Sequence, residues 1–340
     1  MSFKSNNVYL QGRINRIDAR YGMTKANKEF MTVTFTLDIE GNLIKVESFS
    51  MKHKKDGGLL SSYEGLNTLV TEAKCLHKTI KDIGDEEAQV VTDDTIVENI
   101  EDADALDCGN YGIRYTRFTE NAYAREGNLI KNIRLECTYP RRVDEEKKEY
   151  QPKHEFAITG VLIAPAVLLE DAEGNEKVKL TVTIPTLQEA WGDRPESVTL
   201  HDVTVETRDP QAFDYVLDNF SEKGTFVYLE GEIFREVKRV ELESAVDDMG
   251  RGFGKTKHNK DVQYRTEIDE AFIIEAGYPL ETEEVEDMKE MNMELWSVAK
   301  KDKELKEQEM IEGSNVSTPK EKGFGRGEVK QPKKGGVLPF

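Results

Sequence analysis

The sequence has little of what membrane proteins and most enzymes need. No apolar run in its 340 residues approaches the roughly 18–20 residues of a membrane span, and the first residues lack the apolar core of a signal peptide. The five histidines have no nucleophile or carboxylate at a motif spacing, and no zinc-protease, nucleophile-elbow or dinucleotide-binding motif is present. We therefore expect a cytoplasmic protein that is not an enzyme, has no cofactor and contacts no membrane.

Cysteine is scarce as well. Cys75, Cys108 and Cys137 are far apart and odd in number, which is typical of reduced thiols in a cytosol. Cys75 and His77 are close in sequence, but two ligands do not make a metal site. We expect no bound metal.

Charge is unevenly distributed along the chain. The formal net charge of −19 disfavours contact with phosphate, which relies on Lys and Arg. Residues 1–150 carry 22 basic and 26 acidic side chains, but the segment 82–107 alone holds 11 acids and no base. The rest of this region therefore has 22 bases against 15 acids, a net of +7. We infer a basic N-terminal body with one acidic insertion, followed by an acidic region, 151–280, with 14 bases and 26 acids.

Two strand patterns occur twice. The apolar alternation of 8–14, with a glycine at its third apolar place, returns 148 residues later at 156–162. The alternation of 31–37, with threonines on the other face, returns 147 residues later at 178–184. Period-two alternation indicates half-buried strands, and a glycine within a strand indicates a bend or bulge, as at the corner of a small barrel. The repeat predicts the same module twice.

The remaining segments complete the module in both halves. The first half continues with a strand (44–51), a short Ser-capped helix (61–70) and a hairpin (113–125 and 129–139) that turns at Gly127-Asn128. The second half has a helix (209–217), capped by Asp209 with Pro210 in its first turn, and a hairpin (226–235 and 264–274). Three strands, a helix and a closing hairpin are the order of a five-stranded Greek-key OB barrel. We predict a mainly β fold of two tandem OB-fold barrels, followed by a helical segment and a disordered tail.

The domain division follows from these patterns. We expect a first OB-fold domain over residues 1–139, with the acidic insertion 82–107, then a linker over 140–153 and a second OB-fold domain over 154–280. A charged helix over 281–312 and a disordered tail with a docking tip over 313–340 follow.

At this point the chain resembles the bacterial and phage single-stranded-DNA-binding protein family. The matching pieces are VYLQGRI at 8–14, YVLDNFSEKGTFVYLEGEI at 215–233, and the C-terminal Val337-Leu338-Pro339-Phe340. The resemblance implies sequence-tolerant binding and protection of single-stranded DNA in replication, recombination or repair. It also implies that the tip Leu338, Pro339 and Phe340 docks on replication or recombination proteins. Two barrels in one chain differ from the family's usual single barrel, and imply a monomer or a homodimer that presents four barrels. The last 21 residues hold six bases and two acids, unlike the acidic family tip. The tandem architecture and this tip indicate a phage or mobile-element version.

Basic and aromatic residues are interleaved where an OB barrel binds single strands, by stacking bases and lining the backbone with cations. The candidates in the first module are Arg13, Arg16, Arg20, Tyr21, Lys25, Lys28, Phe49, Lys52, Lys54, Lys55, Arg114, Tyr115, Arg117, Phe118, Tyr123, Arg125, Lys131 and Arg134. In the second module a glycine-rich finger adds Arg251, Phe253, Lys255 and Lys257. The alternative is that the aromatic residues belong to the barrel core and the basic residues are ordinary solvated surface.

Other interpretations remain open from the sequence. The acidic insertion is either a solvated loop or an electrostatic gate that competes with DNA for the basic face. The chain could also be an interaction scaffold that recruits replication proteins through its tail, or a recombination mediator.

Overall fold

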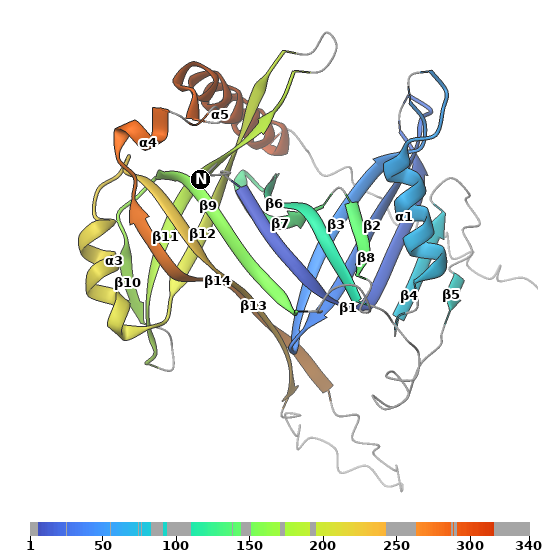
Figure 1. The fold of residues 1–340 in the computed structure, drawn as a ribbon, viewed down its shortest axis with the longest axis horizontal. Coiled ribbons are helices and arrows are strands. Elements are labelled where there is room, and N and C mark those ends of the chain that lie inside the picture. Colours follow the sequence, from blue (N-terminus) through green and yellow to red (C-terminus); the bar gives the residue numbers. More distant parts are fainter. Residues whose placement is uncertain are drawn as a thin grey trace, which may run out of the picture.

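The computed structural model describes residues 6–24, 26–54, 56–73, 75, 77–82, 91–93, 110–137, 139–143, 151–170, 174–190, 195–242, 263–286, 288 and 291–315. Within these residues the strands join in one 14-stranded sheet, which closes into two barrels that stand side by side (Figure 1). No helix in the described ranges is both long and apolar enough to cross a bilayer.

The first barrel is a closed cycle of five strands. Its members are β1 (Asn6–Met23), β2 (Glu29–Ile39), β3 (Asn42–Met51), β6 (Asn110–Arg125) and β7 (Asn128–Glu136). The pairings run β1–β2–β3–β7–β6–β1, all antiparallel except the parallel pair β3–β7. The helix α1 (Ser61–Glu72) connects β3 to the outer strands β4 (His77–Asp82) and β5 (Val91–Asp93), and β8 (Tyr139–Val143) follows β7.

The second barrel repeats the cycle. Its members are β9 (Lys153–Leu162), β11 (Glu176–Gln188), β12 (Ser197–Thr207), β13 (Phe226–Leu242) and β14 (Gln263–Pro279). They pair as β9–β11–β12–β14–β13–β9, with β12–β14 parallel. The edge strand β10 (Val167–Glu170) pairs with β11, and the 3-10 turn η1 (Pro210–Ala212) leads into α3 (Phe213–Asn219). The shared strand order confirms the predicted pair of OB-fold barrels.

The repeated glycines lie where strands cross closely. A Cβ added to Gly12 would lie 2.5 Å from Ile39 Cγ1 and 2.8 Å from the Asp38 carbonyl oxygen. At Gly160 it would lie 2.3 Å from the Thr183 carbonyl oxygen. The two glycines therefore permit the bend that closes each barrel.

Gly160→Ala is expected to lower the free energy of unfolding by about 1–3 kcal/mol, because the new methyl group must displace backbone. The matched control is Gly65→Ala in α1, where nothing lies within 4 Å of the added Cβ; this change should stabilise the chain by up to about 1 kcal/mol. Urea denaturation of both variants measures the difference. Equal effects at the two positions would contradict the close crossing.

The first strands of the two barrels pair with each other. Residues Asn6 to Gln11 of β1 run antiparallel to Lys153 to Ile158 of β9, with Val8 opposite Phe156. Val8 and Phe156 are themselves equivalent in the repeat, so each half presents the same strand to the other. The contact has the self-complementary form of a two-fold dimer interface, within one chain.

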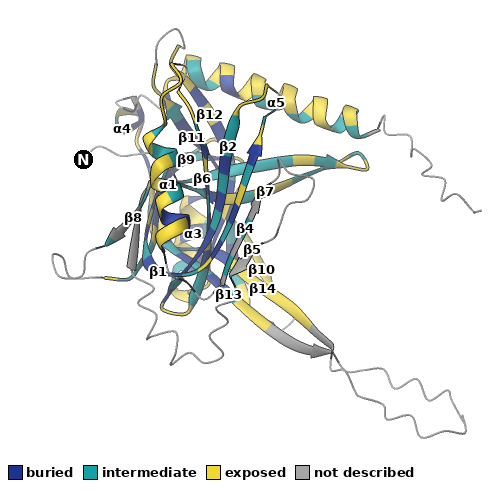
Figure 2. Ribbon diagram, turned by 90° about the vertical axis from the view of Figure 1, so that its right-hand side faces the viewer, coloured by how far each residue is buried: buried dark blue, intermediate teal, exposed yellow. Residues whose placement is uncertain are grey.

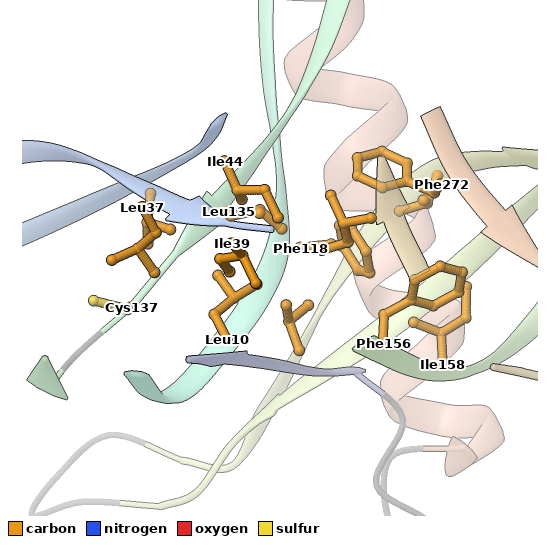
Figure 3. Packing of buried hydrophobic residues seen from close by; sticks show 14 of the residues in the cluster. Leu10, Leu37, Ile39, Ile44, Phe118, Leu135, Cys137, Phe156, Ile158 and Phe272 are labelled. Carbon is orange, nitrogen blue, oxygen red and sulfur yellow. The ribbon is translucent and has the colours of Figure 1, made fainter. Parts of the chain in front are cut away.

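Aromatic side chains fill the junction between the barrels (Figure 3). Phe118 of β6, Phe156 of β9 and Phe272 of β14 meet edge to face, with ring centroids 4.8 Å apart for Phe118–Phe272 and 5.8 Å for Phe118–Phe156. Phe118 is fully buried. Nearby, the Asn6 side chain donates to the Phe118 carbonyl oxygen at 2.9 Å and accepts from the Phe118 amide at 2.8 Å. One apolar cluster therefore extends through both barrels.

Two further crossings link the barrels. At one, the Glu120 amide of β6 donates to His201 Nδ1 at 3.1 Å, and Glu120 Oε2 accepts from the Asp202 amide at 2.9 Å. At the other, the Arg235 guanidinium of β13 donates to the Leu43 carbonyl oxygen and to Glu270 at 3.0 Å. Both Glu120 and Arg235 are almost fully buried, with side chains 6% exposed.

The C-terminal helices complete the fold. After α4 (Thr282–Glu286), the helix α5 (Met293–Asn315) lies against β12 of the second barrel and reaches β6 and β7 of the first; Figure 1 shows it across the top of the molecule. Ala299 packs with Val198 and Leu200 of β12. At the other end the Ser314 hydroxyl accepts from the Gly127 amide, 3.1 Å away in the β6–β7 turn. Figure 2 shows that the face of α5 away from the barrels is exposed.

Several predicted elements differ in detail. The strand β8 occupies the start of the expected linker, because it adds to the edge of β6. The described residues of 281–312 hold two separate α-helices, α4 and α5, where one was expected, and α5 continues to Asn315. The helix α1 has Leu60 at its N-cap and no side-chain cap, whereas Asp209 caps η1 as expected by accepting from the Gln211 amide. The β6–β7 turn is at Glu126-Gly127, one residue earlier than predicted.

Candidate nucleic-acid interface

The outer face of β1, β2 and β3 carries the exposed side chains of Arg20, Lys45 and Phe49. Alternation turns Met31, Val33 and Phe35 inward and leaves the threonines between them on the outside. A bulge after Ile14 shifts β1 by one residue, so that Arg16 and Arg20 lie on the outer face as well.

Rows of paired residues cross this face. Arg20 lies opposite Thr32, which lies opposite Phe49; two residues further along, Gly22 lies opposite Phe30, which lies opposite Met51. At the other end of the face Arg16 pairs with Thr36 and Thr36 with Lys45. The distance from the Lys45 row to the Phe30 row is about 20 Å along the strands.

An aromatic pair stands on this face. The rings of Phe30 and Phe49 are 5.6 Å apart between centroids and tilted by 34°. Phe49 is 51% exposed, so its ring is accessible from solvent. Such a pair offers flat faces on which unpaired bases could stack.

The cations on and beside this face divide into two groups. Among the described residues none forms an ion pair with Arg20, Lys28, Lys45 or Lys54, all of which are exposed. Arg16 is held by Asp18 at 2.7 Å and Lys52 by Glu29 at 2.9 Å. The hydrogen bond to Asp18 raises the pKa of Arg16, and the hydrogen bond to Glu29 raises that of Lys52. We define the outer-face patch as Phe30, Phe49, Arg20, Lys28, Lys45 and Lys54.

Two of the sequence candidates lie in the core instead. Phe118 is fully buried between the barrels, so the alternative of a core aromatic is correct and no base can reach it. Tyr21 is half-buried against the core, and its hydroxyl donates to Asn67 of α1 at 3.0 Å. The bulge in β1 turns it away from the face that carries Arg20.

The β6–β7 hairpin candidates are exposed in part but are tied to neighbouring acids. Arg117 lies 3.5 Å from Glu136, and Arg134 lies 2.8 Å from Glu47. Arg125 lies 3.8 Å from Glu126, while Tyr123 is 43% exposed.

Lys131 is a structural residue rather than a free cation. Its ammonium lies 2.7 Å from Glu307 of α5, 3.1 Å from Asp202 of β12 and 3.7 Å from Glu120. The first barrel, the second barrel and the helix therefore meet at this lysine. These three carboxylates are also close enough together to hold a cation, but Lys131 and Lys303 already occupy the space between them.

The remaining candidates cannot be placed in this face. Arg13 is on the outer side of β1 opposite Asp38 and is partly buried. Arg114 and Tyr115 are in β6, and their side chains lie outside the described residues. The following candidates lie entirely outside the described residues, as does most of the acidic insertion: Lys25, Lys55, Arg251, Phe253, Lys255, Lys257, Leu338, Pro339 and Phe340.

Phe30 and Lys45 were missed by the sequence candidates. The signal was present, because Phe30 shares its parity with Thr32 and Thr34, and Lys45 shares its parity with Phe49. Residues of that parity face outward once the apolar partners face inward.

Burial sets the titration of His201 at the junction of the barrels. The pKa of His201 is lowered to about 4, mainly by burial and next by the nearby Lys303 ammonium. The Glu120 and Asp202 carboxylates oppose the shift. The neutral ring accepts from the Glu120 amide through Nδ1, a bond that protonation would remove.

Acid is therefore expected to weaken the junction. An unfolded histidine binds a proton near pH 6.5, whereas folded His201 does so near pH 4, so stability is complete above about pH 6.5 and falls as pH decreases toward 4. The loss at pH 4 should be on the order of 3 kcal/mol. Urea denaturation at pH 7, 5.5 and 4.5 measures it, with His201→Gln as the control that should flatten this part of the profile. Parallel profiles for the two proteins would show that His201 is not the titrating group.

Comparisons with solved structures return single-stranded-DNA-binding proteins. The chain matches a deletion mutant of the Thermus aquaticus single-stranded DNA binding protein with 12% identity and a TM-score of 0.39, over 69% of this chain and 89% of that one. It matches the wild-type Thermus aquaticus protein with 12% identity and a TM-score of 0.37, over 68% and 85%. The Plasmodium falciparum protein in complex with single-stranded DNA matches with 10% identity and a TM-score of 0.25, over 39% and 100%. The OB-fold assignment rests on the strand pairing of the two barrels, not on these scores.

Sequence comparison identifies a family directly. No curated protein matches the chain. The YorF family model, however, matches residues 4–315, which include every described strand and helix. The chain belongs to the YorF family.

Proposed function

We propose that this protein binds single-stranded DNA without sequence preference and without catalysis, through the outer-face patch of the first barrel. The observation that carries the proposal is the ring pair of half-buried Phe30 and exposed Phe49, one strand away from Arg20. Rings that stack on bases and cations that follow the phosphates are the two components of sequence-tolerant binding. The four cations without a described ion-pair partner would contact the phosphates with little rearrangement.

The geometry favours a single strand over a duplex. The patch lies on and beside three strands of a curved sheet, and its rings can be reached only by bases that are not stacked in a helix. It presents no helix or ribbon that could enter a major groove.

We further propose a role in protecting single strands during replication, recombination or repair, in the cytoplasm of a cell that carries a phage or mobile element. The C-terminal tip would recruit partner proteins there. Cys137 supports a reducing compartment: it is buried and forms no disulfide, and burial raises its pKa to about 12.

Salt-titrated binding of a fluorescent oligothymidine tests this function. Each phosphate contacted in a single strand contributes about −0.7 to the slope of log K against log salt, so four contacts predict a slope of about −3. A duplex of equal length should bind much more weakly. A slope near zero, or equal affinity for duplex, would contradict the proposal.

Arg20→Ala is expected to weaken oligothymidine binding several-fold and to make the salt slope shallower by about 0.7, because one phosphate contact is lost. Lys223→Ala is the matched control, since Lys223 is an exposed cation of the second barrel. Fluorescence anisotropy at three salt concentrations gives both quantities. The combined change of Arg13, Arg16 and Arg20 to alanine should have a larger effect in the same direction. If Lys223→Ala weakened binding as much as Arg20→Ala, the first barrel would not be the site.

An interaction scaffold is the second candidate, and one observation favours it. The edge strand β10 exposes Val167, Leu168 and Leu169 in a row, each 40–49% accessible. Exposed apolar runs of this kind often mark contacts with another protein. A chain that failed the salt titration while retaining partner binding would fit this alternative.

A further inference from the structure

The two barrels differ at positions that the repeat makes equivalent. In the first barrel Thr32 of β2 lies opposite Phe49 of β3. The residue 147 positions after Thr32 is Lys179 of β11, which lies opposite Glu206 of β12. Glu206 therefore occupies the place at which the first barrel presents Phe49, and Lys177 occupies the place of Phe30.

Glu206 forms ion pairs with three cations around it. Its carboxylate lies 2.7 Å from Arg208 Nε, 3.3 Å from the Lys177 ammonium and 3.6 Å from the Lys179 ammonium. Its side chain is only 7% exposed, so these contacts are shielded from water. Arg208 also binds Asp269 at 3.1 Å. The outer face of the second barrel thus has three cations, but all three pair with one buried acid, and Arg208 pairs with a second. Lys177 and Glu206, at the places of Phe30 and Phe49, are not aromatic.

The helix α5 covers the rest of the same face. Val198, Leu200 and Asp202 of β12 share their parity with Glu206 and so belong to its outer face. Leu200 packs against Leu295 and Trp296 of α5, and Asp202 binds Lys303 at 2.8 Å. A groove of about 460 Å³ remains beside the helix. Leu200, Asp202, Trp296 and Lys303 line it, together with the paired side chains of Lys131 and Glu307.

We infer that Glu206 and α5 close the second barrel to nucleic acid, so that each chain binds one single strand, through the first barrel alone. This inference rests on the proposed function, and it assigns Glu206 as the residue that determines which barrel binds. The chain then has two barrels of one fold with one binding face, and the second barrel serves as a platform for α5.

Stoichiometry tests the inference directly. An oligothymidine of about 10 nucleotides fits the site of one OB fold, and native mass spectrometry counts the strands bound per chain. We expect one strand per chain, lost when Phe30 and Phe49 are both changed to alanine. Two strands per chain would overturn the inference while leaving the proposed function intact. A single bound strand that remains after Phe30→Ala/Phe49→Ala but is lost in Lys177→Ala/Lys179→Ala would also overturn the inference. No bound strand at any salt concentration would instead refute the proposed function.

Glu206→Gln provides an independent test. Releasing Lys177 and Lys179 should let a strand of about 20 nucleotides reach both barrels, tighten binding several-fold and steepen the salt slope by about 1.4. Glu176→Gln is the matched control: it removes the same charge from an exposed position of β11 and should leave the slope unchanged. A slope that responds equally to both changes, or to neither, overturns the inference. Because Glu206 is buried, thermal melts accompany the titration. Should Glu206→Gln fail to fold, Lys177→Ala/Lys179→Ala decides, since the inference requires it to bind oligothymidine like the unchanged protein.

Discussion

Changing Phe30 and Phe49 together to alanine is expected to weaken oligothymidine binding by at least about 30-fold, since each base stacked on an aromatic ring contributes about 1–3 kcal/mol. The two rings form one pair on the outer face of β2 and β3, in which Phe49 is exposed and Phe30 half-buried. Their loss removes the stacking surface but no cation. The salt slope should therefore stay near its original value while the affinity falls at every salt concentration.

The controls separate stacking from folding. Tyr123→Ala removes another exposed ring, 43% accessible, from the β6–β7 hairpin and should change affinity little. Phe49→Trp keeps an aromatic face and should retain most of the binding. Unchanged affinity in the double alanine variant, with an unchanged melting temperature, would remove the outer-face patch as the binding site.

Phe118→Ala is expected to lower the free energy of unfolding by about 3–5 kcal/mol, the range for large aromatic residues removed from a packed core. The ring is fully buried and meets Phe156 and Phe272 edge to face. Because its neighbours pack around it, the deletion leaves a cavity between the barrels (Figure 3). Because the cavity lies where both barrels share one core, we expect a single unfolding transition that moves to lower denaturant concentration.

Tyr123→Ala serves as the comparison for stability too, because it lies on the same strand but is exposed; its effect should stay within about 0.5 kcal/mol. Urea denaturation followed by circular dichroism gives both values. A loss below about 1 kcal/mol for Phe118→Ala would contradict a shared core. Two separate transitions would show that the barrels unfold independently.

The fold was largely predictable because its evidence is local and repeated. Alternation at 8–14 and 31–37, repeated in the second half, predicts strands whose inward residues are the ones that the structure buries. The glycines at 12 and 160 predict the close crossings that the structure contains. Strands β4, β5, β8 and β10 were not predicted, since short edge strands carry little alternation.

The candidate site was predictable only in part. The sequence candidates include Arg20 and Phe49 of the outer-face patch, but the bulge in β1 reverses the facing of the residues that follow it, so Tyr21 lies against the core and Arg20 faces out. The ion pairs could not be predicted from the sequence, because their partners are far apart along the chain: Arg134 pairs with Glu47, and Lys131 pairs with Asp202. Spacing along the chain does not reveal which acid neutralises which base.

Because the two barrels belong to one chain, the residues on the two sides of their contact can differ. In an assembly of two identical subunits, every substitution at the two-fold interface appears on both sides, so an acid buried at one crossing would also be buried at the equivalent crossing. Here the corresponding crossings carry Glu120 on one side and Arg235 on the other, each with its own partners. A covalent link between the halves thus permits an asymmetric junction, in which opposite charges occupy positions that symmetry would force to be the same.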